Sequence, residues 1–141
     1  MAHIHLCTLR RRAFEQQCGF CHYCGLPMWE ADEAAFAARF GLSARLTRLL
    51  RSTAEHLVAR CDGGRDERSN IVAVCHWCND RRHHGRPHAA PSAEAYLQRV
   101  ARRMASGLWH PANSIPQVLE SRSLQRTPAK RFLDPKRRAS T

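Results

Sequence analysis

The sequence has no long apolar run. No stretch approaches the roughly 20 apolar residues of a membrane-spanning helix, and the opening MAHIHLCTLRRRAF has no continuous apolar segment of the kind found in secretory signal peptides. These absences argue against a membrane protein and against a secreted disulfide scaffold. We therefore expect a cytoplasmic, reduced protein in which closely spaced cysteines bind metal.

Acidic residues are also scarce. The chain has 12 acidic against 23 basic residues, which gives a formal net charge of +11. Such a balance attracts polyanions, chiefly nucleic acid. No repeating pattern of aromatic and basic residues indicates an RNA-stacking platform, and no protein partner is evident, so DNA is the expected partner.

The length of 141 residues and the hydrophobic content of 43% are typical of one domain with a modest core, which a structural metal would help to stabilise. We expect this domain to cover residues 1–112. Residues 113–141 are rich in Ser, Pro, Gln and basic residues with few large apolar ones. This composition predicts a basic, mostly disordered tail.

Strand patterns occupy the middle of the chain. Residues 52–59 and 71–75 read as two antiparallel strands, joined by a loop over 60–70 in which Gly63-Gly64 forces a turn. A helix is expected from Cys78 to the break at Pro87. The alternation in residues 3–7 predicts a further, terminal strand with His3 and His5 on its surface.

Helical patterns flank these strands. Residues 30–51 predict two short amphipathic helices, broken at Gly41 and restarted by a cap at Ser43. Residues 92–106 predict a C-terminal helix with Tyr96, Leu97, Val100 and Met104 on one face.

Two cysteine pairs have the spacing of zinc ligands. Cys21 and Cys24 are followed by Gly25, which permits a tight turn, and Cys75 and Cys78 repeat the two-residue spacing. Together they predict a closed, four-thiolate structural zinc site; the alternative is a set of reduced core cysteines. Cys18 is expected to be a small buried residue, and no role is assigned to Cys7 or Cys61.

A carboxylate, an imidazole and two amides surround the second pair. Glu55-His56 lies in the first strand, Asn70 precedes the second, and Asn79 follows Cys78. Singly each is a weak signal. In this order, with the motifs CHYCG, EHLVARCDGG, SNIVAVC and CHWCN, residues 18–84 resemble the HNH endonuclease family. The resemblance implies an α+β fold with a small ββα-metal core, a zinc-knuckle pair, a helical insertion and a C-terminal helix.

The resemblance also implies roles. His56 matches the general base, and an imidazole, which titrates near neutral pH, can deprotonate water. Glu55 and Asn79 match ligands of a catalytic divalent ion, for which their oxygens suit Mg²⁺ or Mn²⁺. Asn70 matches the residue that braces the loop and orients the histidine. His83, one helical turn beyond Asn79, could be a third ligand and would favour Zn²⁺ or Ni²⁺.

Arginines gather around this motif in the sequence and suit contacts with phosphate. They are Arg60, Arg65, Arg81, Arg82 and Arg86. The leading hypothesis is a DNA endonuclease. Because the family usually has Asp where this chain has Glu55, a zinc-containing nucleic-acid-binding module without catalysis is the main alternative. A helix-turn-helix-like regulator built on residues 33–51 is a weaker one.

Overall fold

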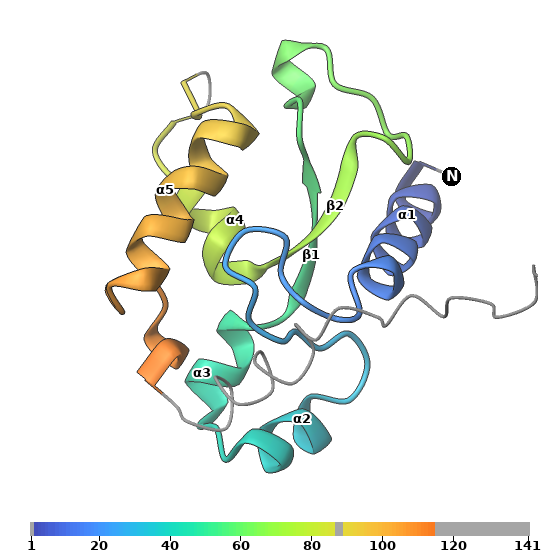
Figure 1. The fold of residues 1–141 in the computed structure, drawn as a ribbon. Helices are drawn as coiled ribbons and strands as arrows, with labels where there is room; N and C mark the ends of the chain where they lie inside the picture. The colour runs from blue at the N-terminus through green and yellow to red at the C-terminus, as the bar shows by residue number, and fades with distance from the viewer. Residues whose placement is uncertain (1, 87–88, 115–141) are drawn as a thin grey trace, which may run out of the picture.

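A two-stranded antiparallel sheet lies at the centre of the computed structural model, which describes residues 2–86 and 89–114. The strands are β1 (Ser52–His56) and β2 (Ile71–Cys75), and α4 (His76–His83) follows β2 directly. The expected order of strand, loop, strand and helix is thus confirmed, as is the small α+β fold of ββα type. In Figure 1 the sheet lies between α1 on one side and α4 and α5 on the other.

The two edges of β1 have different partners. One edge pairs with β2 in a register that sets Glu55 opposite Val72. On the other edge, Asn79 Nδ2 donates to the carbonyl oxygen of Ala54 (3.2 Å), and Arg82 Nη1 donates to that of His56 (2.9 Å). Side chains of α4 therefore satisfy the carbonyls that β2 leaves unpaired, which fixes the helix along this edge.

The N-terminal segment is a helix, so the strand predicted over residues 3–7 is wrong. Helix α1 runs from Ala2 to Gln16 and packs against both strands, with Leu9 and Ala13 buried. The period-2 alternation covers only five residues, whereas the helical spacing from Leu9 to Ala13 continues through the next turn and meets the sheet. His5 is exposed, on a helix rather than a strand.

Cys18 ends this segment and is exposed, not buried as predicted. Its φ of 54° places it in the left-handed region just beyond α1, where the chain turns back toward the sheet. The backbone then forms a hairpin closed by a bridge between Phe20 and Pro27. Gly25, with φ of 71°, accepts the left-handed conformation at its tip.

The two helices predicted within 30–51 are present as α2 (Glu33–Phe40) and α3 (Ala44–Leu49). Gly41 ends α2 in the left-handed conformation, and Ser43 Oγ accepts from Leu46 N (3.3 Å) to cap α3, as expected. Helix α3 packs against α2 and α4. Both helices thus cover the core, and α3 lies next to α4.

The predicted C-terminal helix is α5 (Ala93–Ala105), capped by Ser92 Oγ, which accepts from Ala95 N (3.2 Å). Tyr96, Val100 and Met104 face the core, as predicted. A short 3₁₀ helix, η2 (Pro111–Ser114), crosses the boundary expected at residue 112, and the rest of the predicted tail lies outside the described residues. Among those residues, no helix has the length and apolarity to span a membrane.

Candidate metal centre and active site

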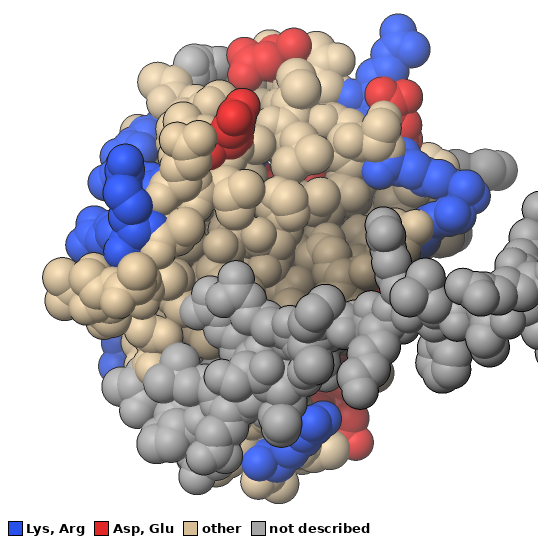
Figure 2. Space-filling view, in the orientation of Figure 1, with Lys and Arg blue, Asp and Glu red and all other residues tan. Residues whose placement is uncertain are grey.

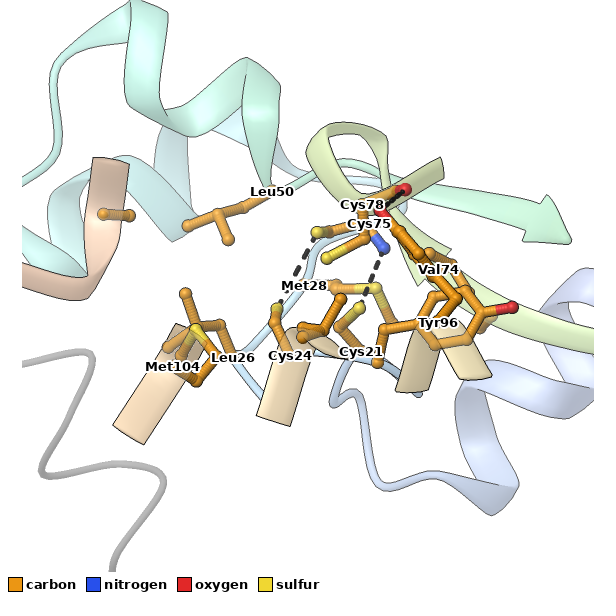
Figure 3. Packing of buried hydrophobic residues seen from close by; sticks show 14 of the residues in the cluster. Cys21, Cys24, Leu26, Met28, Leu50, Val74, Cys75, Cys78, Tyr96 and Met104 are labelled. Atoms are coloured by element: carbon orange, nitrogen blue, oxygen red, sulfur yellow. Dashed lines mark hydrogen bonds between the residues drawn. The ribbon is translucent and has the colours of Figure 1, made fainter. Parts of the chain in front are cut away.

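Four cysteines from two distant segments meet in the core. The Sγ atoms of Cys21, Cys24, Cys75 and Cys78 all lie within 4.8 Å of one another, and all four residues are buried. Figure 3 shows the two pairs facing each other beside Tyr96. Zn–S bonds of about 2.3 Å in a tetrahedron place sulfurs about 3.8 Å apart. The distance from Cys24 Sγ to Cys75 Sγ is 3.9 Å, so these residues fit the expected zinc ion.

The surroundings of the sulfurs suit thiolates. The backbone N–H of Cys75 donates to Cys21 Sγ (3.3 Å), and Trp109 Nε1 donates to Cys78 Sγ (3.2 Å). Burial raises the pKa of the Cys75 and Cys78 thiols well above the ordinary value, and neighbouring Cys21 adds to this. The Cys75 and Cys78 thiols therefore resist ionising without a nearby cation, which a bound zinc ion would supply.

Glu55 is buried next to this centre. Its side chain is 2% exposed and forms an ion pair with Arg82 Nη1, whose side chain is 3% exposed. Tyr23, which lies between Cys21 and Cys24, donates its hydroxyl to Glu55 Oε1 (3.4 Å). Burial raises the pKa of Tyr23, with Glu55 adding to the effect, so the phenol remains a donor. Glu55 thus links the zinc loop to α4.

Arg82 is buried and has a structural role, so the predicted contact of this residue with phosphate is wrong. The guanidinium donates to Glu55 and Tyr23 and to the carbonyls of His56, Leu57 and Pro91. The sequence pattern could not distinguish it from Arg81, which is adjacent and exposed. A basic residue on an otherwise polar helix gives no signal of burial.

Replacing Arg82 by leucine should therefore destabilise the domain by about 3–5 kcal/mol, because a buried carboxylate loses its charge partner. Urea unfolding followed by circular dichroism measures this. The same substitution at exposed Arg81 is the matched control and should cost about 1 kcal/mol or less, for its stacking on Trp77. Equal midpoints for the two variants would contradict the assigned role.

His83 approaches Glu55 from the solvent side. His83 Nε2 lies 3.0 Å from Glu55 Oε1 and 3.2 Å from Oε2, and its side chain is 37% exposed. Asn79, one turn earlier on α4, is held by donating to Thr53 Oγ1 (3.0 Å) as well as to the β1 edge. This leaves its Oδ1 as the free acceptor of the amide.

A cavity of about 380 Å³ opens at this place. It is lined by Thr53, His76, Asn79, Asp80, His83 and His84. Glu55 lies behind this lining, in contact with His83. Ligands about 2.1 Å from a divalent ion lie about 3 Å apart when adjacent, which is the separation of Glu55 and His83. The donor atoms of Glu55 and His83 therefore lie at the separation of adjacent ligands, and Asn79 lines the same cavity as His83.

His56 has different partners, because successive side chains of a strand point to opposite faces. His56 Nε2 lies 2.7 Å from Asp66 Oδ1, and Arg60 Nη2 bridges to Asp66 Oδ2 (2.8 Å). The hydrogen bond with His56 lowers the pKa of Asp66, and Arg60 adds to this. In the tautomer that donates from Nε2 to Asp66, Nδ1 of His56 is the nitrogen that can accept a proton.

Asp66 was missed because it stands in a loop, where no periodicity marks a partner. Asn70 fastens this loop: its Oδ1 accepts from Val58 N (2.8 Å), while Nδ2 donates to the carbonyls of Val58 and Arg65 (3.0 Å each). Gly64 permits the packing, since a Cβ there would lie 1.7 Å from the Val58 carbonyl oxygen. Of the predicted phosphate contacts, Arg65 and Arg81 are exposed, and Arg60 is exposed but paired with Asp66.

The chain therefore presents a ββα unit with a four-cysteine cluster positioned to bind a metal ion and, on the same strand and helix, the contact between Glu55 and His83. Residues 44–85 match the model of the HNH endonuclease family. This segment, from α3 through α4, is similar to the HNH family, which confirms the resemblance over this part of the predicted range 18–84. Comparison with curated proteins and with solved structures finds no match to this chain.

Proposed function

We propose that the protein is a metal-dependent endonuclease that hydrolyses DNA phosphodiester bonds. The observation that carries the proposal is the placement, inside the HNH segment, of Asn79 and His83 on one cavity, with Glu55 in contact with His83 behind it. His56 is the next residue of the same strand. The net charge of +11 supports a polyanionic substrate.

Glu55, Asn79 and His83 would hold the divalent ion. Bound there, the ion would stabilise negative charge on the phosphate and on the leaving 3′-oxygen. The set combines oxygen donors with an imidazole, so Mn²⁺ and Ni²⁺ are candidates beside Mg²⁺. Arg82 forms an ion pair with Glu55 in the core and compensates its negative charge.

His56 would act as the general base. Glu55 and His56 are the last two residues of β1 and their side chains lie on opposite faces of the strand, so the scissile phosphate would lie beside the C-terminal end of β1. His56 Nδ1 takes a proton from water, the water oxygen bonds to phosphorus, and the bond from phosphorus to the 3′-oxygen breaks. The products would carry 5′-phosphate and 3′-hydroxyl ends.

The test is cleavage of supercoiled plasmid by the zinc-loaded full chain with Mg²⁺, Mn²⁺ and Ni²⁺ in parallel. The proposal expects nicked or linear DNA with at least one ion and none when only monovalent salt is present. The alternative is a DNA-binding zinc module without catalysis, favoured by the ion pair that engages Glu55. Binding without cleavage under all three ions would establish that alternative.

Asp66 orients the base in this scheme, and Asp66→Asn should lower kcat by about 10²-fold, the cost of a misplaced catalytic group. The dissociation constant for DNA should stay within about twofold, because phosphate contacts are unchanged. Asp62→Asn removes the same charge from an exposed position of the same loop and is the control. Similar rates for both variants would remove Asp66 from the mechanism.

A further inference from the structure

A second cavity, of about 260 Å³, lies outside the candidate active site, between the end of α4 and α5. It is lined by Arg81, His84, Arg86, Tyr96, Arg99, Arg103 and Trp109. Four of these seven residues are arginines from three consecutive segments: α4, the connection and α5. In Figure 2 a dense group of Lys and Arg atoms covers the left edge of the molecule, where Figure 1 places α5.

The positive charge of this cavity has no compensation within the described part of the chain. No ion pair there joins Arg81, Arg86, Arg99 or Arg103 to a carboxylate. Arg99 and Arg103 stand four residues apart on α5, a spacing at which like charges destabilise a helix by a few tenths of a kcal/mol. The arrangement is unfavourable in the free protein and becomes favourable with a bound anion.

The walls of the cavity are held by the zinc centre. Tyr96 is 2% exposed and donates its hydroxyl to the Cys78 carbonyl (2.7 Å), while Trp109 Nε1 donates to Cys78 Sγ (3.2 Å). Arg103 lies over the Trp109 ring, 5.8 Å from its centroid. Stacking on aromatic rings limits the freedom of a guanidinium before any ligand arrives, so part of the site is preorganised.

The second cavity adjoins the candidate active site. His84 lines both cavities, and the two open on neighbouring faces of the same helix. A DNA strand with one phosphate beside Asn79 and His83 that continues along α4 would therefore place its next phosphates beside His84 and then beside the arginines. Guanidinium groups match phosphate oxygens, with which they form paired hydrogen bonds.

We propose that this arginine cavity (Arg81, Arg86, Arg99 and Arg103) binds the backbone phosphates of the DNA strand next to the scissile phosphate. This inference rests on the proposed nuclease function and adds to it a positioning site on α5, outside the matched segment. The site contacts phosphate rather than bases, so it holds the strand in register without selecting its sequence.

The test compares two double variants of the full chain that lose the same charge. Arg99→Gln with Arg103→Gln alters the cavity. Arg11→Gln with Arg12→Gln alters exposed positions of α1, on the other side of the sheet. Binding of a fluorescent 20-base-pair duplex is measured by anisotropy without added divalent ion, over a series of salt concentrations. Zinc content and circular dichroism verify that each variant is folded.

The cavity variant should bind at least about tenfold more weakly near 0.1 M salt, and its salt slope should fall by about 1.8, the value for two lost phosphate contacts. The α1 variant should change both quantities much less. The double variant Arg99→Lys with Arg103→Lys keeps the charge and should retain most of the salt slope. In cleavage, the cavity variant should raise KM and leave kcat within about twofold.

Equal weakening in both glutamine variants, or none in either, would overturn the proposal, since total charge alone would then explain binding. Failure of the nuclease proposal is recognised separately. If the wild-type protein fails to cleave DNA with any of the three ions while only the cavity variant binds DNA weakly, that result would support the phosphate site and exclude the nuclease function. If the wild-type protein cleaves DNA but the two glutamine variants bind it equally well, the nuclease function would stand and the phosphate site would be excluded.

Discussion

Replacing Cys78 by serine should abolish zinc binding and unfold the domain. Structural zinc contributes on the order of 10 kcal/mol or more to such small folds, which exceeds the stability that a modest core supplies alone. Cys78 is fully buried, and its sulfur accepts the indole N–H of Trp109. The variant should lose its zinc in metal analysis and its cooperative thermal transition, and the emission of partly buried Trp109 should shift to that of an exposed indole.

Cys61→Ser is the matched control, because Cys61 is exposed and lies outside the cluster. It should keep one zinc ion per chain and an unchanged thermal midpoint. Chelation of the wild-type protein should reproduce the Cys78 variant, and added zinc should reverse it. A Cys78→Ser protein that melts cooperatively near the wild-type midpoint would show that the sulfurs are core residues and not ligands.

The zinc centre also fixes the candidate active site. Cys75 ends β2 and occupies the N-cap position of α4, and Cys78 lies in the first turn of that helix. On the opposite loop, Tyr23 stands between two ligands and contacts both Glu55 and Arg82. Loss of the ion would release these contacts together, so catalysis should be lost with the fold rather than after it.

Much of this arrangement could be predicted from the sequence, because spacing in the chain reports it directly. Two-residue separations place Cys21 with Cys24 and Cys75 with Cys78 on tight turns. Gly41 and Ser43 have strong conformational preferences, for a left-handed stop and a helix cap, which long-range packing does not override. The second strand has its predicted bounds, Ile71–Cys75, whereas the first ends at His56 and not at the predicted residue 59.

The N-terminal helix could not be predicted in this way. Its first residues alternate like a strand. The helix is stabilised by the burial of Leu9 and Ala13 against the sheet, which the local sequence does not show. That contact joins segments about 60 residues apart in the chain. Tertiary packing of this kind overrides a weak local pattern.

The partners of the site residues were also beyond local reasoning. The sequence marks Glu55 and His56 as candidates, but Arg82 and Asp66 show their roles only once the chain is folded. Arg82 occupies a position where most arginines are solvated, and it is buried because the edge of β1 offers carbonyl acceptors there. The positive charge of an arginine does not by itself predict whether the side chain is buried or solvated.

His56→Ala should lower the rate of DNA cleavage by about 10³-fold, within the 10²–10⁴-fold range of general base catalysis. The side chain is partly buried against Asp66 and makes no contact with the zinc centre, so folding and DNA affinity should remain near wild type. Single-turnover cleavage at saturating protein isolates this chemical step from binding.

Comparing Asn79→Ala with His56→Ala distinguishes the loss of a metal ligand from the loss of a general base. Both variants should be slow, but added imidazole should restore part of the rate only in His56→Ala, where a small base can occupy the space of the missing ring. A higher concentration of Mn²⁺ should help only Asn79→Ala, because a weakened ion site still fills by mass action. Cleavage by His56→Ala at the wild-type rate would exclude His56 as the base. Water activation would then require another group at the cavity, of which His76 and His84 are the exposed imidazoles.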